Sequence, residues 1–401
     1  MPRIRVLRAG LQSSVQDAGR RGSEHLGVTV GGWVDDFAPR WANRLLGNDL
    51  GAAVLEFTLL GPDLEAVDPG WVALTGADMG AAVNGRTWPP GTTRHLLAGD
   101  RVTFGGAARG VRAYLAAAGG IDVPVVLSSR STDLVAGFGG LGGRALQPGD
   151  ELQYPGGGAE SVRAPVETCR WGSRIRILSG VRSDRFPPES WRRLVGGSYR
   201  VTDQSDRIGL RLHGPTVSDT PVRGDHLSEG MAIGSIEVPP SGELLVLLKS
   251  RGSIGGYSTL AHAATVDWPT LGQLGPGDEV TFVEVGAAEA LRLLQEREAL
   301  FDCAPVGDEP QDPGPASGRA TESVEVRAPM WCIIHGANLP GQSPLVRVGD
   351  RVTRGQTLAI FEVMTQFYEL ASPSNGRIIS KGFADGDVVT EGALLFVIAP
   401  E

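Results

Sequence analysis

A Gly-Asp turn followed by a strand-like run occurs three times in the first 301 residues of this chain and constrains their fold more than any other feature. The copies read GDRVTFGG from Gly99, GDELQYPG from Gly149 and GDEVTFVEV from Gly277. Apolar and polar residues alternate within each run, as in a strand with one buried face. Glycine, which accepts the backbone angles of tight turns, supplies 57 of the 401 residues. The pattern predicts a mainly β protein.

Two further motifs recur in the same order along the chain. The segment VQDAGRRG, from Val15 to Gly22, is echoed by DQSDRIG, from Asp203 to Gly209. Each is followed by a strand-like run that carries a glutamate, Glu56 in LEFTLLGP and Glu237 in IEVPPSG. Chance recurrence of turn residues is the alternative, but an ordered pair of motifs favours a duplicated β unit.

Helix signals and a proline-rich stretch suggest where the domains begin and end. The segment DDFAPRWANRLLGN predicts a helix that begins after an acidic cap, Asp35 or Asp36, and ends at Gly47. Residues Gly286 to Phe301 are rich in strong helix formers and predict a second helix. The next segment has four prolines and almost no apolar periodicity, which predicts a solvated linker. We expect a first β unit over residues 1–160, a second over 161–301, the linker over 302–323 and a C-terminal domain over 324–401.

Charge and composition exclude several classes of function. The formal net charge of −9 argues against a nucleic-acid partner, which would need a basic face. The three cysteines form no CxxC pair and the six histidines show no ligand spacing, so we predict neither a metal site nor a disulfide framework. No apolar run fits a signal peptide or a membrane helix, so we expect a cytoplasmic protein without a membrane partner. Lysine occurs only as Lys249 and Lys381.

Longer motifs in both halves resemble a known family. They are VLRAGLQSSVQDAGRRG, LGVTVGGWVDDFAPRWANRLLGN and RAYLAAAGGID in the first half, and YRVTDQSDRIGLRLHGP and GGYSTLAHAATVDWPTLGQLGPGDEVTF in the second. Together they resemble the biotin-dependent carboxyltransferase family, which includes the C subunit of 5-oxoprolinase and part of urea carboxylase. The resemblance implies two cyclophilin-like β-barrel units. It also implies transfer of a carboxyl group from carboxybiotin to a nitrogen nucleophile such as urea or a lactam amide.

The C-terminal segment is similar to a second family. VRAPMWCIIHGANLPGQSPLVRVGDRVTRGQTLAIFEVM resembles the biotin carrier domain of acetyl-CoA carboxylase, which implies a flattened biotinyl/lipoyl-type β-barrel. That family attaches biotin to the lysine of Glu-Ala-Met-Lys-Met, whereas residues 362–366 here read Glu-Val-Met-Thr-Gln. Threonine has no amine to form the amide, so Thr365 marks a lost attachment position. We therefore expect no covalently bound cofactor, with biotin on a separate carrier as the alternative donor.

The resemblance and the residue chemistry point to a set of candidate site residues. The motif QSDR supplies an amide, an acid and a guanidinium that can orient an amide substrate. The glycines of SIGGYST can present backbone N–H groups to a developing oxyanion. Glu237 stands where the family carries glutamine, and Lys249 can bind an anion or act as a base. The catalytic candidates are Gln204, Asp206, Arg207, Glu237, Lys249 and Tyr257. The substrate-binding candidates are Ser253, Gly255, Gly256, Gln16, Asp17, Arg20 and Glu56. A structural ion pair, a core position or a solvated side chain is the alternative role for each.

Two interpretations of the function compete. In the first, the chain is a carboxyltransferase-family enzyme subunit that acts on a small amide, lactam or carboxylated metabolite, with a partner subunit supplying the other carboxyltransferase half. Its carrier-like domain is degenerate and not biotinylated. In the second, it is a non-catalytic regulatory or scaffold subunit of a 5-oxoprolinase/urea carboxylase-like complex, or a biotin-independent enzyme repurposed for specialised metabolism. The departures from the family motifs, at Glu237, Ser253, Ser258 and Thr365, favour altered or lost chemistry.

Overall fold

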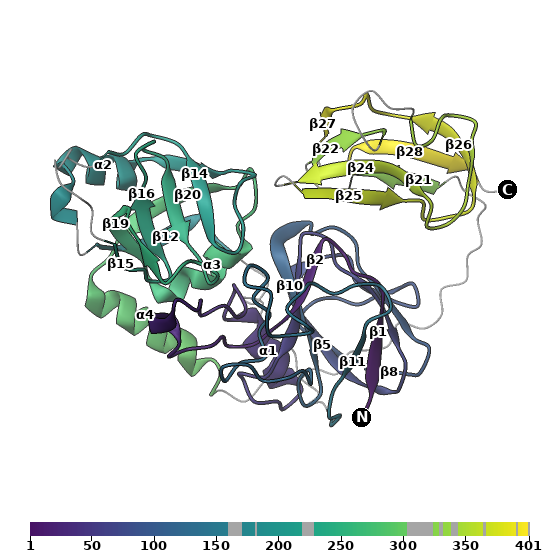
Figure 1. Ribbon diagram of the computed structural model, residues 1–401, viewed down its shortest axis with the longest axis horizontal. Helices are drawn as coiled ribbons and strands as arrows, with labels where there is room; N and C mark the ends of the chain where they lie inside the picture. The colour runs from purple at the N-terminus through teal and green to yellow at the C-terminus, as the bar shows by residue number, and fades with distance from the viewer. Residues whose placement is uncertain are drawn as a thin grey trace. The chain divides into compact units, whose positions relative to one another are not determined.

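The computed structural model describes residues 1–158, 171–180, 183–218, 228–302, 324–328, 332–337, 344–363, 366–389 and 392–399. The chain divides into two compact units, Met1–Glu309 and Pro310–Glu401 (Figure 1). The division falls inside the segment 302–323 for which a linker is predicted. Residues 303–323 lie outside the described part, as do 159–170, so the linker and the boundary between the two β units stay predictions.

Two antiparallel sheets form the first half of the larger unit. The six-stranded sheet has the order β11 (Glu151–Gln153), β1 (Arg3–Arg8), β4 (Asp63–Ala66), β9 (Arg101–Thr103), β6 (Ala82–Val83) and β7 (Arg86–Thr87). The five-stranded sheet has the order β2 (Gln12–Gln16), β3 (Val54–Thr58), β10 (Arg109–Ala117), β5 (Gly70–Asp78) and β8 (Thr92–Leu96). Apolar side chains from both sheets, among them Val6, Phe57 and Leu115, form one buried core.

The second half closes into a β-barrel. Its strand order is β12 (Arg174–Ser179), β19 (Ser258–Ala263), β16 (Ser235–Val238), β17 (Leu244–Leu247), β14 (Gly209–His213), β13 (Ser198–Val201) and β20 (Glu279–Glu284). A separate two-stranded ribbon pairs β15 (Glu229–Gly230) with β18 (Ile254–Gly255). In β20 the apolar Val280 and Phe282 are buried and Glu279 and Glu284 are exposed, which is the alternation that the Gly-Asp repeat predicts.

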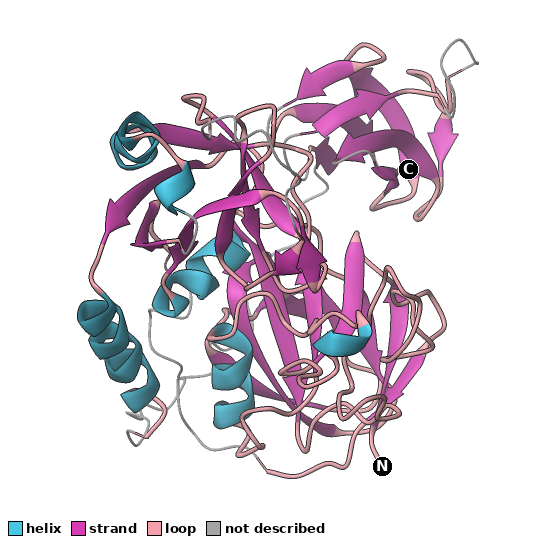
Figure 2. Cartoon of the chain, turned by 60° about the vertical axis from the view of Figure 1, so that its left-hand side comes forward, coloured by secondary structure: helices cyan, strands magenta, loops and turns pink. Residues whose placement is uncertain are grey.

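The mainly β class is therefore confirmed (Figure 2). The two halves of the larger unit are not copies of one sheet arrangement, however. The second half closes into a barrel, whereas the strands of the first half are divided between two sheets.

Few helices accompany the strands. They are α1 (Ala38–Leu45), α2 (Pro188–Gly196), α3 (Trp268–Gln273) and α4 (Ala287–Ala299), with short 3-10 turns at η1 (Glu24–Leu26), η3 (Ser183–Arg185) and η4 (Thr265–Asp267). The predicted acidic cap of α1 is Asp35, whose Oδ1 accepts hydrogen bonds from the backbone N–H groups of Phe37 and Ala38 at 2.8 and 3.1 Å. Among the described residues, no helix is long and apolar enough to cross a membrane.

Apolar contacts join the two halves of the larger unit. Val34, which precedes α1 in the first half, is buried in the core of the second-half barrel. Phe37, just before α1, and Trp41 of α1 pack on Phe301 beyond the end of α4. The rings of Trp41 and Phe301 are stacked, with their centroids 5.1 Å apart. The chain that follows β20 thus returns through α4 to the first half, where Phe301 packs on α1.

The smaller unit consists of two four-stranded sheets. One has the order β21 (Val324–Arg327), β28 (Leu394–Ala399), β26 (Gly376–Lys381) and β23 (Arg351–Val352). The other has the order β25 (Gln366–Ala371), β24 (Thr357–Val363), β22 (Cys332–His335) and β27 (Asp387–Val389). Leu358, Phe361, Phe396 and Ile398 are buried at 1% exposure or less, so this unit has a core of its own.

Candidate functional site

The two halves of the larger unit meet at a buried ion pair. Arg207, in the loop before β14, donates from Nη1 to Glu56 Oε1 on β3 and from Nη2 to the carbonyl oxygen of Gly32 at 2.5 Å. The other carboxylate oxygen of Glu56 accepts the backbone N–H of Val34 at 2.9 Å. Both side chains are buried, so each ion is satisfied by the other and by backbone groups rather than by water.

A second polar contact beside this ion pair joins α3 to the first half. Gln273 Nε2 donates to Asp35 Oδ2 at 2.8 Å and to the carbonyl oxygen of Arg112 at 2.9 Å, while its Oε1 accepts the N–H groups of Val111 and Arg112. Burial raises the pKa of Asp35 to about 6 and outweighs these hydrogen bonds, which lower it. The Tyr114 hydroxyl accepts the backbone N–H of Asp35 at 3.0 Å, and burial raises the pKa of that phenol.

Arg112 links the two contacts. Its Nη1 donates to the carbonyl oxygen of Gly272, and its Nε lies 3.9 Å from Glu56 Oε1. Asp206 also lies close enough to act on the pKa of Arg112, although burial, which lowers that pKa, is the larger effect. The Asp206 carboxylate is exposed and caps its own turn, because Oδ1 accepts the N–H groups of Ile208 and Gly209. Gln204 is exposed in the same loop.

Lys249 follows β17 and is a buried amine. Its side chain is 3% exposed, and its Nζ lies 5.3 Å from the centroid of the half-buried Trp268 ring. Its carbonyl oxygen accepts the N–H of Gly31, so the lysine sits where the first-half loop rests on the barrel. Burial lowers the pKa of Lys249 to about 8, helped by Arg21, Arg251 and Arg297 and opposed by Asp36.

Glu237 is a buried carboxyl group on β16. It is 4% exposed, and its Oε1 has no hydrogen-bond partner in the part of the chain that the structure describes. Ile236 and Val238 belong to the barrel core, so strand alternation directs Glu237 and Ser235 to the outer face. There Ser235 Oγ lies 3.2 Å from His262 Nδ1 on the neighbouring strand. Burial, followed by the charge of Glu229, raises the pKa of Glu237 to about 7.

The motif SIGGYST approaches the same face. Gly255 pairs with Glu229 in the β15–β18 ribbon, and β19, which begins at Ser258, pairs with β16 so that Glu237 faces Thr259. A Cβ on Gly255 would lie 2.9 Å from Met231 Sδ, so Gly255 packs closely against that side chain. Ser253 accepts the N–H of Met231 through its carbonyl oxygen. Gly256 and Tyr257 are exposed, the latter at 47%.

The Trp268 ring relates the position of Lys249 to strand β16, which carries Glu237. A Cβ on Gly234, one residue before the strand, would lie 2.8 Å from Trp268 Nε1, so the indole under Lys249 abuts the start of β16. Glu237 is three residues further along, which is a distance of about 10 Å in a strand. The structure therefore brings a buried amine, a buried carboxyl group and the glycine motif to one side of the barrel.

The candidates Gln16, Asp17 and Arg20 contact a loop of the first half that is separate from the Glu56–Arg207 ion pair. Asp17 accepts hydrogen bonds from the hydroxyls of Ser129 and Ser131 at 2.6 and 2.5 Å and from the N–H of Arg130. Arg20 is fully buried, donates to the carbonyl oxygen of Ser131 and lies 4.6 Å from the Phe138 ring centroid. The remaining member, Gln16, donates to the carbonyl oxygen of Thr132 at 3.1 Å. These three side chains thus fix the segment SSRSTD of the first half.

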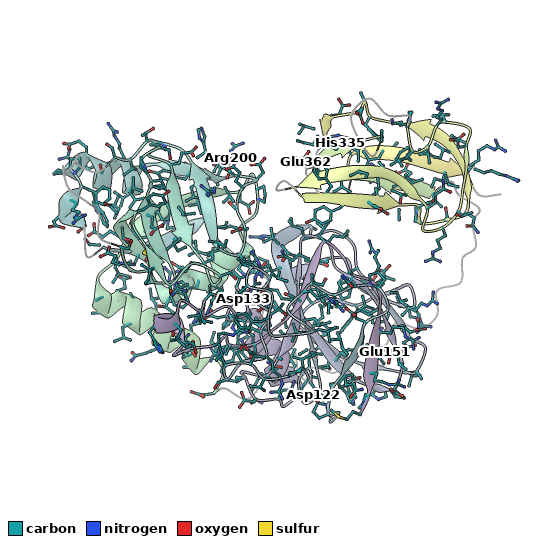
Figure 3. All side chains as sticks on the ribbon, viewed as in Figure 1. Asp122, Asp133, Glu151, Arg200, His335 and Glu362 are labelled. Atoms are coloured by element: carbon teal, nitrogen blue, oxygen red, sulfur yellow. The ribbon has the colours of Figure 1, made fainter. Side chains whose placement is uncertain are left out.

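The smaller unit contains the hairpin in which biotin attachment would occur. Strands β24 and β25 pair from Thr357 with Ala371 down to Val363 with Gln366. Beside the hairpin, His335 Nε2 lies 3.2 Å from Glu362 Oε2 (Figure 3). Thr365 lies outside the described residues, and its hydroxyl cannot form the amide that attaches biotin to lysine. Covalent biotin therefore does not fit this sequence. In the described ranges of the chain no three metal-ligating side chains converge.

Comparison with known proteins identifies both units. Residues 26–284 match the family described as carboxyltransferase domain, subdomain A and B. Over 300 residues the chain is 37% identical to the C subunit of 5-oxoprolinase from Escherichia coli (strain K12), covering 75% of this chain and 96% of that protein. This chain belongs to the carboxyltransferase family. Residues 324–398 match the biotin–lipoyl family described as biotin-requiring enzyme.

Two further relatives show which parts are shared. The crystal structure of the Kluyveromyces lactis urea carboxylase superposes with a TM-score of 0.71 at 29% identity, covering 75% of this chain and 29% of that chain. This chain thus spans less than a third of that solved enzyme. The biotin carboxyl carrier protein of acetyl-CoA carboxylase from Cyanidium caldarium is 37% identical over 78 residues, which are 20% of this chain and 51% of that protein. Both resemblances predicted from the sequence motifs are confirmed.

Sequence reasoning missed several residues of this site. Gln273 and Trp268 lie in a motif of the carboxyltransferase family but had no chemical role assigned, and His262 and Arg251 were not singled out. Asp35 was predicted only as one of two alternatives for a helix cap, and Arg112 and Tyr114 were not among the candidates. The available signal was that Gln273 is an amide within an otherwise apolar helix segment, WPTLGQL.

Proposed function

We propose that this chain is a carboxyltransferase subunit that places a carboxyl group on the nitrogen of a small amide, lactam or carboxylated metabolite. The observation that carries the proposal is a pair of buried titratable groups, Lys249 after β17 and Glu237 on β16. Each has a pKa displaced toward neutrality, to about 8 and about 7 respectively. Groups of this kind suit proton transfer at neutral pH.

The proposed roles follow from the chemistry of each group. Neutral Lys249 can take the proton from the substrate nitrogen, and protonated Glu237 can donate a hydrogen bond to the substrate carbonyl. The N–H groups at Gly255 and Gly256 are the proposed donors to the oxyanion, with Tyr257 and Ser253 beside them. Arg207 and Glu56 are proposed to hold the loop of Gly31 and Gly32 against the barrel and thereby to position Lys249.

The remaining candidates receive supporting roles in this proposal. Gln204 and Asp206 form the exposed loop that carries Arg207. Gln16, Asp17 and Arg20 stabilise the segment SSRSTD. We propose that the carboxyl donor is biotin on a separate carrier, because Thr365 cannot bind it, and that a partner subunit supplies the other carboxyltransferase half.

Transfer of label from bicarbonate tests the proposal. The full chain would be combined with a biotin carboxylase, a separate biotinylated carrier and the partner subunit, and candidate acceptors such as 5-oxoproline and urea would be offered with ¹⁴C-bicarbonate. We expect label in the acceptor with the unmodified chain. Lys249→Met should reduce transfer by roughly 10²–10³-fold, while Lys381→Met should leave it unchanged. Equal transfer by both variants would contradict the assignment of Lys249.

A non-catalytic role is the second candidate. The observation that favours it is the joint change at Thr365 and Glu237, where the carrier has lost its attachment residue and the barrel has an acid in place of the amide of the family. In this interpretation the chain is a regulatory or scaffold subunit whose smaller unit is a docking surface. Failure of every acceptor to take label, together with stable binding of the partner subunit, would support it.

A further inference from the structure

In the described part of the chain, the amine of Lys249 lacks the partners that a buried ammonium ion normally has. It is 3% exposed and lies against the face of Trp268, with Nζ 5.3 Å from the ring centroid. The carboxylate that acts on it, Asp36, is already held by Arg297, whose Nη1 and Nη2 donate to its two oxygens at 3.1 and 3.3 Å. A protonated amine here is therefore desolvated without a carboxylate of its own.

Three arginines contribute positive charge that lowers the pKa of this amine. Arg21, Arg251 and Arg297 all act on Lys249, and the last two are buried at 7% and 9% exposure. Arg251 Nε donates to the carbonyl oxygen of Met231 at 2.8 Å, and Arg297 Nη1 donates to that of Thr265 at 3.2 Å in the turn that leads into Trp268. These bonds hold the two guanidinium groups in place. The positive charge of these arginines disfavours an ammonium ion at Lys249 and favours an anion there.

We propose that the Lys249 amine takes up carbon dioxide reversibly and carries it as a carbamate. The neutral amine attacks the carbon of CO2, and the new N–C bond forms as one C–O π pair moves onto oxygen. The nitrogen then gives its proton to a solvent base such as bicarbonate, which leaves an N-carboxylate on Lys249. The charge at this position changes from zero to −1, and the three arginines stabilise the product by the interaction that opposes protonation of the amine.

The inference goes beyond the proposed function and does not depend on it. Carbamate formation requires CO2 and the neutral lysine, whereas carboxyl transfer requires a donor carrier and an acceptor. Occupancy should rise with pH, because the neutral fraction of Lys249 grows as pH passes through its pKa of about 8. The groups that set this titration are Asp36, Arg21, Arg251 and Arg297.

Carbon-13 NMR of the full chain in ¹³C-bicarbonate tests the inference. The chain has two lysines, so Lys381→Met is a matched control: Lys381 Nζ also lies over an aromatic ring, 4.2 Å from the centroid of Phe383. The N-terminal amine is present in every variant. We expect one carbamate resonance that is kept in Lys381→Met and lost in Lys249→Met. A resonance that survives Lys249→Met unchanged, or no lysine carbamate in the unmodified chain, would overturn the inference.

Covalent trapping keeps the test decisive if Lys249→Met does not fold. Alkylation of the carbamate in the unmodified chain, followed by proteolysis and mass spectrometry, should place the labelled carboxyl group on the peptide that contains Lys249. Label found only on Lys381 or on the N-terminus contradicts the proposal. Transfer of label to an acceptor without a carbamate on Lys249 would refute this inference and leave the proposed function standing. A carbamate on Lys249 without transfer to any acceptor would support this inference and count against the proposed function.

Discussion

Gln273 Nε2 donates a hydrogen bond of 2.8 Å to Asp35 Oδ2, although 238 residues of chain separate the two. The same amide group completes the backbone hydrogen bonds of β10 at Val111 and Arg112. The Gln273 side chain, which belongs to the second half, thus hydrogen-bonds both to the residue that caps α1 and to the backbone of β10 in the first half. Because all of these groups are buried, the junction is held in one register, and that register places the Gly31 loop against Lys249.

Replacing Gln273 by methionine should therefore destabilise the whole larger unit. The change keeps the volume but leaves the Val111 and Arg112 N–H groups and an Asp35 oxygen without partners. We expect a loss of about 2–4 kcal/mol in the free energy of unfolding, measured by urea titration. Gln295→Met, at an exposed position of α4, is the matched control and should change stability by less than about 0.5 kcal/mol. Equal effects of the two variants would show that the junction amide is dispensable.

The Glu56–Arg207 ion pair should behave as a coupled unit. Glu56→Gln leaves the buried Arg207 charge without its acid and should cost about 3–5 kcal/mol of stability. Arg207→Met should cost a similar amount, and the double variant should lose much less than the sum. The exposed pair of Arg200 and Glu279, with an N–O distance of 3.3 Å, is the control and should contribute less than about 1 kcal/mol. Additive losses at Glu56 and Arg207 would mean that the two side chains act independently.

Features with a local cause could be predicted from the sequence. The cap of α1 follows from Asp35 being next to the helix it caps, and the mainly β class follows from alternation within single runs. The prediction that α4 begins near Gly286 differs from the observed start, Ala287, by one residue. The carboxyltransferase and carrier motifs were recognisable because each lies within a short continuous stretch.

Features with distant partners could not be predicted in this way. Asp206 and Arg207 are adjacent in sequence, but one is exposed and caps its own turn while the other is buried against Glu56, 151 residues away. Nothing in the run VTDQSDR indicates which of the two points inward. Likewise, the similarity of VQDAGRRG to DQSDRIG does not indicate that Arg20 fixes a loop within the first half, whereas Arg207 joins the halves.

Glu237 should make stability depend on pH. Its pKa is raised from 4.5 to about 7, so the native state binds a proton more tightly than the unfolded chain does. Stability is then highest below about pH 4.5 for this group and falls as pH rises through about 7. Glu237→Gln removes that dependence and should be more stable than the unmodified chain by on the order of 1–2 kcal/mol at about pH 8. Urea titrations at about pH 5 and about pH 8 measure the difference.

The control for this prediction is Glu289→Gln, at an exposed position in the first turn of α4. It should leave the pH profile of the unmodified chain unchanged. A profile for Glu237→Gln that parallels the unmodified chain from about pH 5 to about pH 8 would show that Glu237 does not take up a proton in that range.

The last prediction concerns the carrier-like unit. The unmodified chain should carry no biotin when a biotin ligase is co-expressed, because residue 365 is threonine, and intact mass should equal the mass of the polypeptide. Thr365→Lys supplies the missing amine between two strands that pair in register down to Val363 and Gln366. We expect this variant to accept biotin, because the hairpin on either side retains the fold of the biotin–lipoyl family. A streptavidin signal from the unmodified chain would contradict the assignment of Thr365.

Biotinylation of Thr365→Lys should nevertheless restore only part of the carboxyl transfer by the chain's own carrier at about pH 8. The carboxyl donor is an anion, and at about pH 8 the Glu237 carboxyl, with a pKa of about 7, is mostly negative and repels it. Adding Glu237→Gln to Thr365→Lys removes that charge and restores the amide of the family, so the double variant should transfer more label than either single variant. The readout is ¹⁴C transfer from bicarbonate with biotin carboxylase and the partner subunit present. Full transfer by Thr365→Lys alone would show that Glu237 does not oppose the donor, and that the missing lysine is the whole of the defect.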